Sequence, residues 1–213
     1  QPPTCPANWG QLYLPFFKSL YDGGHFLAVA HALRQLGGPG SKGQPICDAL
    51  MGYFSGCTEM LMLMLSGALT LSERWPGSAI KITPGVRQQI DELINTTDRL
   101  IAAMEIGGVF DDSRTRLEFL SIWRNADRFV TAELASLATK RANAVIAARS
   151  QPSVDHDDVL WLLKSIWSWF DIGRRYNLLE SSPEKWRTHI LEDLSIGLAQ
   201  ATCFEEGDTL VER

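Results

Sequence analysis

The stretch VLWLLKSIWSWFDIGRRY, residues 159–176, is apolar on nearly every side when it is wound into a helix. Its charged residues are Lys164, Asp171, Arg174 and Arg175. A helix that is hydrophobic all round is buried, either in the core of a larger protein or in an interface. We therefore expect residues 153–178 to form the most buried helix of an all-α bundle.

Glycines, prolines and capping residues divide the chain into about seven predicted helices around this central Trp-rich helix. The predicted ranges include 26–36, 45–54, 58–72 and 83–105, with Ser55-Gly56 as a break inside the apolar region. An earlier helix is expected at residues 11–20, a last helix from residue 182, and a short strand could form at residues 79–82.

The longest predicted helix begins at Asp112 or Ser113 and runs to about residue 149. At 1.5 Å per residue it would exceed about 50 Å, which is longer than a compact domain of this size needs. A kink or a projecting end is therefore expected, and residues 112–149 could join two copies in a homo-oligomer.

The composition is that of an ordinary globular protein, with 45% apolar and 21% charged residues. We expect a single all-helical domain over residues 1–213, with the option of a smaller N-terminal helical subdomain (1–74) and a long-helix bundle (83–204). The net charge of −5 argues against a nucleic-acid binder. No uncharged apolar run reaches the roughly 18 residues of a membrane span, so no transmembrane segment is expected.

Four cysteines suggest two disulfides, one between the chain ends (Cys5 with Cys203) and one local (Cys47 with Cys57). Four reduced thiols are the alternative, because free cysteine packs well as a small buried residue. Disulfides form in oxidising compartments, so the pairing predicts an exported or extracellular protein. A cytoplasmic location follows if the thiols are free.

Three motifs resemble catalytic or ligand-binding motifs, but none has the residue order, spacing or structural context that the chemistry needs. In GGPGSKGQ (residues 37–44) the hydroxyl residue precedes Lys42, and no strand leads into the loop, so it is not a phosphate loop. GYFSG (52–56) lacks the spacing of a nucleophile elbow. The cluster DHDD (155–158) is better explained as carboxylates at a helix start. We therefore expect no catalytic residues, no metal site and no cofactor.

Residues 159–176 contain an unusually high number of tryptophans for one helix. Bulky core residues explain them simply, but they could also line a pocket for an apolar small molecule or form a patch for a protein partner. The predicted binding residues are Trp161, Trp167, Trp169, Phe170, Tyr176 and His189. Tyr176, His189 or Asp171 could orient one polar group of a ligand.

We therefore predict a non-enzymatic helical binding protein, exported from the cell, that holds an apolar ligand or a protein partner against the Trp-rich helix. A helical viral or structural assembly protein is a further alternative, which the overlong helix favours.

The segment VLWLLKSIWSWFDIG (159–173), followed by SPEKWRTHILEDLSIGLA (182–199), loosely resembles the ligand-binding half of TetR-type repressors. That resemblance implies a cytoplasmic ligand-responsive transcriptional regulator with a helix-turn-helix at residues 27–54. The charges oppose it, because residues 1–69 carry three cations (Lys18, Arg34, Lys42) against three carboxylates (Asp22, Asp48, Glu59). A DNA-reading element needs cations for phosphate contacts.

Overall fold

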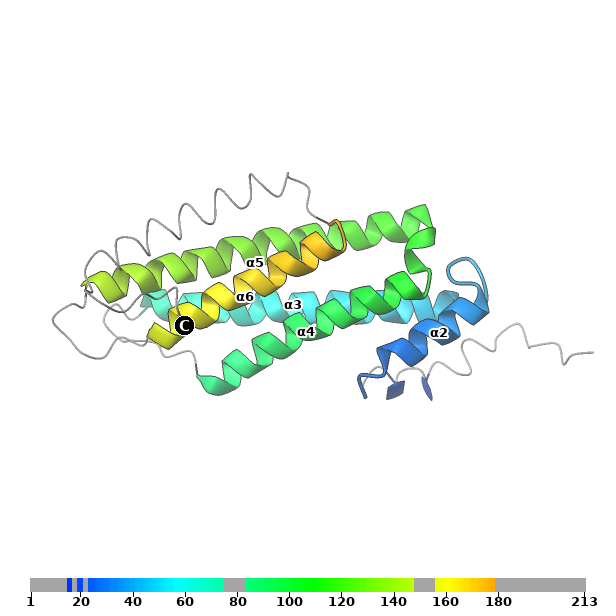
Figure 1. Ribbon diagram of the computed structural model, residues 1–213, viewed down its shortest axis with the longest axis horizontal. Coiled ribbons are helices and arrows are strands. Elements are labelled where there is room, and N and C mark those ends of the chain that lie inside the picture. Colours follow the sequence, from blue (N-terminus) through cyan, green and yellow to red (C-terminus); the bar gives the residue numbers. More distant parts are fainter. Residues whose placement is uncertain (1–14, 17–18, 21–22, 75–82, 148–155, 179–213) are drawn as a thin grey trace, which may run out of the picture. The chain divides into compact units, whose positions relative to one another are not determined.

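The protein is described here from a computed structural model, which defines residues 15–16, 19–20, 23–74, 83–147 and 156–178. These residues form five α-helices and one 3-10 turn, with no strand among them (Figure 1). The all-α prediction is confirmed for this part of the chain. The expected strand at residues 79–82, the expected last helix from residue 182 and most of the expected helix at 11–20 lie outside the described residues.

The helices are, in chain order, α2 (Phe26–Leu36), α3 (Gln44–Arg74), α4 (Pro84–Ile106), η1 (Val109–Asp111), α5 (Ser113–Ala147) and α6 (His156–Arg175). They divide into two compact units. The first unit takes the described residues among Gln1–Leu61 and Glu92–Ala126, and the second takes those among Met62–Asp91 and Asp127–Arg213. Helices α3, α4 and α5 therefore each contribute to both units.

The helix ends follow local capping chemistry. Helix α2 ends at Gly37, which adopts a left-handed φ of 94° that favours glycine. The backbone N–H of Gly38 donates to the carbonyl of Leu33 at 3.2 Å, and the N–H of Gly37 donates to the carbonyl of Arg34 at 3.4 Å. This pair of bonds is a Schellman motif, which satisfies the last carbonyls of a helix.

Helix α5 begins as the sequence predicts, with Asp112 as its N-cap. One oxygen of the Asp112 carboxylate accepts hydrogen bonds from the backbone N–H and the hydroxyl of Thr115, both at 2.8 Å. These bonds lower the pKa of the Asp112 carboxyl below its ordinary value. Helix α4 is capped in the same way, because the N–H of Val86 donates to the hydroxyl of Thr83 at 3.4 Å.

The predicted break at Ser55-Gly56 is wrong, because α3 continues through it for 31 residues. Burial on both sides of the glycine outweighs the roughly 1 kcal/mol that glycine costs inside a helix. Phe54 and Leu61 are fully buried, and the buried Thr58 hydroxyl donates to the carbonyls of Phe54 and Ser55 at 3.2 and 2.8 Å.

The predicted Cys47–Cys57 disulfide is also wrong, and both thiols are free. Ten residues along one continuous helix separate the two positions by about 15 Å, whereas disulfide-bonded residues have Cα atoms within about 7 Å. Burial raises the pKa of Cys47 to about 12, with a further contribution from the nearby charge of Asp48, and burial also raises the pKa of Cys57. The predicted Cys5–Cys203 bridge lies outside the described residues.

The segment Gln44–Gly67 of α3 has a mean hydropathy of 1.2 and is long enough, at 24 residues, to cross a membrane. This result concerns length and composition alone, and the core helix of a soluble protein meets the same criterion. Within this chain 33% of its apolar window is buried. The absence of a transmembrane segment stays a prediction from sequence.

An aromatic cluster forms the centre of the first unit. The ring of Phe119 on α5 lies 4.9 Å from that of Phe54 on α3 and 4.6 Å from that of Phe110 on η1, measured between centroids. Trp123, one turn further along α5, is completely buried. Tilted ring pairs at these distances add to the free energy gained from burial alone.

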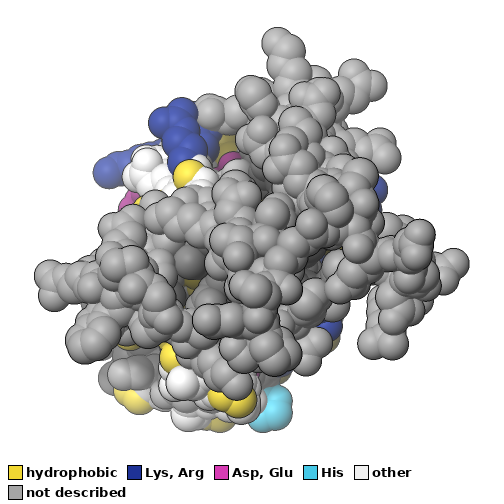
Figure 2. All heavy atoms as spheres, turned by 90° about the vertical axis from the view of Figure 1, so that its left-hand side faces the viewer, with side chains coloured by type: hydrophobic (Ala, Val, Ile, Leu, Met, Phe, Trp, Pro, Cys, Tyr) yellow, Lys and Arg dark blue, Asp and Glu magenta, His cyan; other side chains and the backbone are white. Residues whose placement is uncertain are grey.

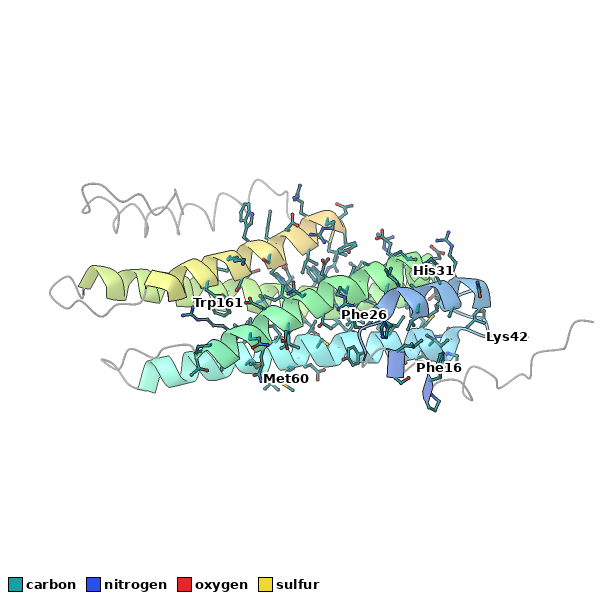
Figure 3. The ribbon with its side chains drawn as sticks, turned by 60° about the horizontal axis from the view of Figure 1, so that its bottom comes forward. Phe16, Phe26, His31, Lys42, Met60 and Trp161 are labelled. Carbon is teal, nitrogen blue, oxygen red and sulfur yellow. The ribbon has the colours of Figure 1, made fainter. Side chains whose placement is uncertain are left out.

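Helix α2 approaches the end of α4 closely within the same unit. A Cβ added at Gly107 would lie 3.0 Å from the carbonyl oxygen of Ala103 and 3.4 Å from the Cβ of Leu33. The Arg34 guanidinium donates to the carbonyl of Ile106 at 3.3 Å, which satisfies a terminal acceptor of α4. At the other end of α2, the Arg99 guanidinium lies over the Phe26 ring, 5.0 Å from its centroid (Figure 3).

We expect Phe119→Ala to lower the free energy of unfolding by about 3–5 kcal/mol, because the substitution leaves a cavity between Phe54 and Phe110. Urea denaturation followed by circular dichroism measures the change. Leu117→Ala is the matched control, since Leu117 lies on the same helix but is 66% exposed. Equal losses for the two variants would contradict the cluster as the centre of the unit.

We expect both helix cysteines to remain reduced thiols under air. In a Cys5→Ser/Cys203→Ser variant, a maleimide should add to two thiols after denaturation without any reductant, as counted by intact mass. Under native conditions Cys57 should react before Cys47, because Cys57 is only half-buried and Cys47 is fully buried. An unreactive protein that gains two thiols on reduction would show that the bridge forms.

Candidate functional site on helix α6

Trp161 is held at the α4 side of the second unit. Its indole N–H donates to both carboxylate oxygens of Asp91, at 3.1 and 3.0 Å. The Arg87 guanidinium lies over the same indole, 5.8 Å from the ring centroid (Figure 3). The half-buried indole is therefore fixed by a charge-assisted hydrogen bond at its edge and a cation–π contact on its face.

Trp169 is held in the same way against α5. Its side chain is 1% exposed, and its indole N–H donates to one carboxylate oxygen of Asp127 at 3.0 Å. A buried indole needs such a partner, because an unpaired N–H in the core costs free energy. Ser165, Ile166 and Ile172 are buried with it and complete this inward side of α6.

Trp167 differs from the other two tryptophans, because its side chain is 52% exposed. Its ring stacks on that of Phe170, with centroids 5.5 Å apart and planes inclined by 25°. Phe170 is itself 6% exposed, so it forms a buried support under the exposed indole. We call the exposed surface of residues 164–175, which consists of Lys164, Trp167, Arg174 and Arg175, the Trp167 face.

The C-terminal end of α6 carries an ion-pair network. Asp171 accepts hydrogen bonds from Arg174 at 2.8 Å and from Arg175 at 2.7 Å. Both lower the pKa of the Asp171 carboxyl, which therefore stays ionised to a lower pH than usual. Arg175 also lies over the ring of Tyr176 at 6.0 Å. Asp171 is thus already paired, and His189 lies outside the described residues.

A cleft is present in the first unit, and it is not lined by helix α6. A cleft of about 720 Å³ lies between α3 and the first turns of α5. Its lining contains none of the residues that the sequence predicted as a binding site. The cleft is lined by Gly40, Gln44, Asp48, Met51, Gly52, Ser55, Asp112, Arg114, Thr115, Glu118 and Ile122.

Polar groups of the loop at one end of the cleft form hydrogen bonds with each other and with the start of α3. Residues 37–43 join α2 to α3, and the Ser41 hydroxyl donates to the carbonyl of Gly38. The Gln44 side-chain oxygen accepts from the N–H of Gly40 at 2.6 Å, while its amide donates to Asp48 at 2.7 Å. Among the described residues, no three His, Cys, Asp or Glu side chains gather in a metal-binding group.

Comparison of the chain with family models, with characterised proteins and with solved structures finds no match to any of them. The function is therefore argued from the chain's own geometry. Five of the six predicted binding residues are described, and the structure gives them different environments. Trp161 and Trp169 are anchored inward, Phe170 is a buried support, Trp167 is turned to solvent, and Tyr176 lies under the Arg175 guanidinium. The carboxylates that anchor the indoles, Asp91 and Asp127, were not predicted from the sequence.

We expect Trp169→Phe to lower the free energy of unfolding by about 1–3 kcal/mol, because the hydrogen bond to the Asp127 carboxylate is lost. Trp167→Phe, two residues away on the exposed side, should change it by less than about 0.5 kcal/mol. Urea denaturation of both variants measures the difference. A larger loss for Trp167→Phe would contradict the assignment of Trp169 as the structural indole.

Proposed function

We propose that this chain is a non-enzymatic helical binding protein that engages a protein partner through the Trp167 face of α6. The observation that carries the proposal is the half-exposed Trp167 ring, stacked on the buried Phe170. A large aromatic side chain left in water on an otherwise anchored helix is typical of a binding anchor. Tryptophan and arginine are the residues most enriched at the energetic centres of protein interfaces.

The surroundings of Trp167 support a protein partner over a small apolar ligand. A small-molecule site encloses most of its ligand in a concave, apolar pocket. Trp167 instead projects from a convex helix and is flanked by the exposed cations Lys164 and Arg174. An apolar centre with a charged rim is the usual anatomy of a protein–protein interface.

Rigidity on both sides of Trp167 also supports the proposal. The Asp91 and Asp127 carboxylates fix the indoles at positions 161 and 169, and Phe170 fixes the plane of the Trp167 ring. A preorganised anchor loses little side-chain entropy on binding, so more of the contact free energy appears as affinity.

We also propose that the protein is exported from the cell. The predicted disulfide between Cys5 and Cys203 is the remaining basis for this, because Cys47 and Cys57 are free thiols. A disulfide between these two residues would form in an oxidising compartment. The binding proposal does not depend on the compartment, since the Trp167 face needs no disulfide.

We expect Trp167→Ala to weaken partner binding by about 30-fold, which corresponds to the roughly 2 kcal/mol of an interface hot spot. Affinity capture from an extract of the source cells, followed by titration of the recovered partner, measures the change. Leu117→Ala is the control, because Leu117 is similarly exposed at 66% but lies in the first unit.

A direct readout uses fluorine NMR of protein labelled with 5-fluorotryptophan. The Trp167 resonance, assigned by its absence in Trp167→Phe, should shift on addition of the partner, whereas the Trp169 resonance should stay in place. A partner that is retained equally by wild type and Trp167→Ala, or that moves only the Trp169 signal, would contradict the proposal.

A further inference from the structure

We propose that the cleft of the first unit is the docking site for the Trp167 face of a second copy of this chain. The inference rests on the proposed function, because it names the partner of that face. It joins two surfaces that lie on different units: the cleft between α3 and α5, and the exposed side of α6.

The two surfaces match in length. The α3 wall of the cleft runs from Gln44 to Ser55, and the Trp167 face runs over residues 164–175. Both span about 16 Å at 1.5 Å per residue. The cleft volume of about 720 Å³ is ample for an indole and its neighbouring side chains.

The lining of the cleft suits an inserted tryptophan. Apart from its chain neighbours and the adjoining helix backbone, no atom lies within 4 Å of the position that a Cβ would occupy on Gly52, so an incoming ring can approach the α3 backbone closely. Met51 and Ile122 supply apolar contacts from the two walls. A methionine thioether makes favourable contacts with aromatic rings.

The charges of the two surfaces are opposite. The cleft carries three carboxylates (Asp48, Asp112, Glu118) and one guanidinium (Arg114), a formal charge of −2. Residues 164–175 carry three cations (Lys164, Arg174, Arg175) and one carboxylate (Asp171), a formal charge of +2. Complementary surface charge of this kind steers association and fixes the register of the bound partner.

The negative charge of the cleft comes from both of its walls. Asp48 lines the cleft from α3, whereas Asp112 and Glu118 line it from the start of α5. A cleft lined by an excess of one sign of charge concentrates the electric field inside it. The cleft therefore attracts a cationic helix and disfavours an anionic one.

Sedimentation velocity of the full chain provides the first measurement. We expect a concentration-dependent mass above that of the monomer, which falls as the salt is raised from about 0.1 M to about 1 M, because the Debye length shortens from about 10 Å to about 3 Å. A monomer at every protein concentration reached, or association that strengthens with salt, overturns the inference.

A matched pair of glycine variants tests the cleft itself. Gly52 and Gly56 lie one turn apart on α3, and a Cβ on either would meet nothing within 4 Å beyond the adjoining helix itself, but only Gly52 lines the cleft. Gly52→Leu should weaken self-association by at least about 10-fold, and Gly56→Leu by less than about 2-fold. Equal effects of the two variants overturn the inference.

A charge variant provides a second test of the cleft, independent of the glycines. Asp48→Asn/Glu118→Gln keeps the shape of both side chains and should weaken association a few-fold while flattening its salt dependence. Glu105→Gln, an exposed residue of the first unit outside the cleft, is the control. An unchanged salt dependence in the double variant overturns the inference.

Mixing the two kinds of variant gives the sharpest outcome. Gly52→Leu retains the Trp167 face and Trp167→Ala retains the cleft, so each should self-associate only weakly, whereas an equimolar mixture should form a 1:1 heterodimer. Native mass spectrometry resolves the two chains by their masses. Failure of the mixture to associate overturns this docking.

The outcomes separate this inference from the proposed function. Self-association that Trp167→Ala abolishes but Gly52→Leu does not would overturn docking in the cleft and leave the Trp167 face as a partner site. Self-association that survives both variants would instead fit an interface on another surface, such as the long helix α5.

Discussion

The contact between Phe119 and Phe54 determines how the first unit is arranged, because it fixes α5 against α3. The neighbouring residues on each helix, Glu118 and Ser55, then lie in the walls of the cleft. One side of the helix pair is thus closed by aromatic packing, and the adjoining side, where Gly52 has no side chain, stays open. The cleft is a consequence of where the bulky and the small residues fall on two helices.

The parts of the fold that could be predicted from sequence are those encoded by residues close in the chain. Gly37, Thr83-Pro84 and Asp112 mark helix ends through capping bonds that span three to five residues, and the structure confirms all three. The break at Ser55-Gly56 was wrong because its outcome depends on burial against other helices. That single error also produced the wrong disulfide, since Cys47 and Cys57 could meet only across a bend.

The candidate site was predictable in its residues but not in their roles. The concentration of tryptophans on α6 is visible in the sequence, whereas the carboxylates that anchor them lie 70 and 42 residues away. Helical periodicity indicates which side chains share a face, and it contains no information on which distant helix supplies a hydrogen-bond acceptor. For the same reason the cleft, whose two walls come from helices far apart in sequence, was not foreseen. Figure 2 shows that a few hydrophobic side chains of the described residues reach the surface on one side of the molecule. Trp167 is the largest exposed hydrophobic side chain among the described residues.

The difference between Trp167 and its neighbours explains why binding is assigned to one indole out of three. Burying a tryptophan removes about 150–250 Å² from water, so Trp161 and Trp169 have already gained most of this free energy within the chain. Trp167 retains about half of its surface in solvent. At about 25 cal/mol per Å², covering the remaining 100 Å² or so would contribute about 2.5 kcal/mol. Phe170 already occupies the inner side of the ring, so this free energy is available to a partner that contacts the solvent side.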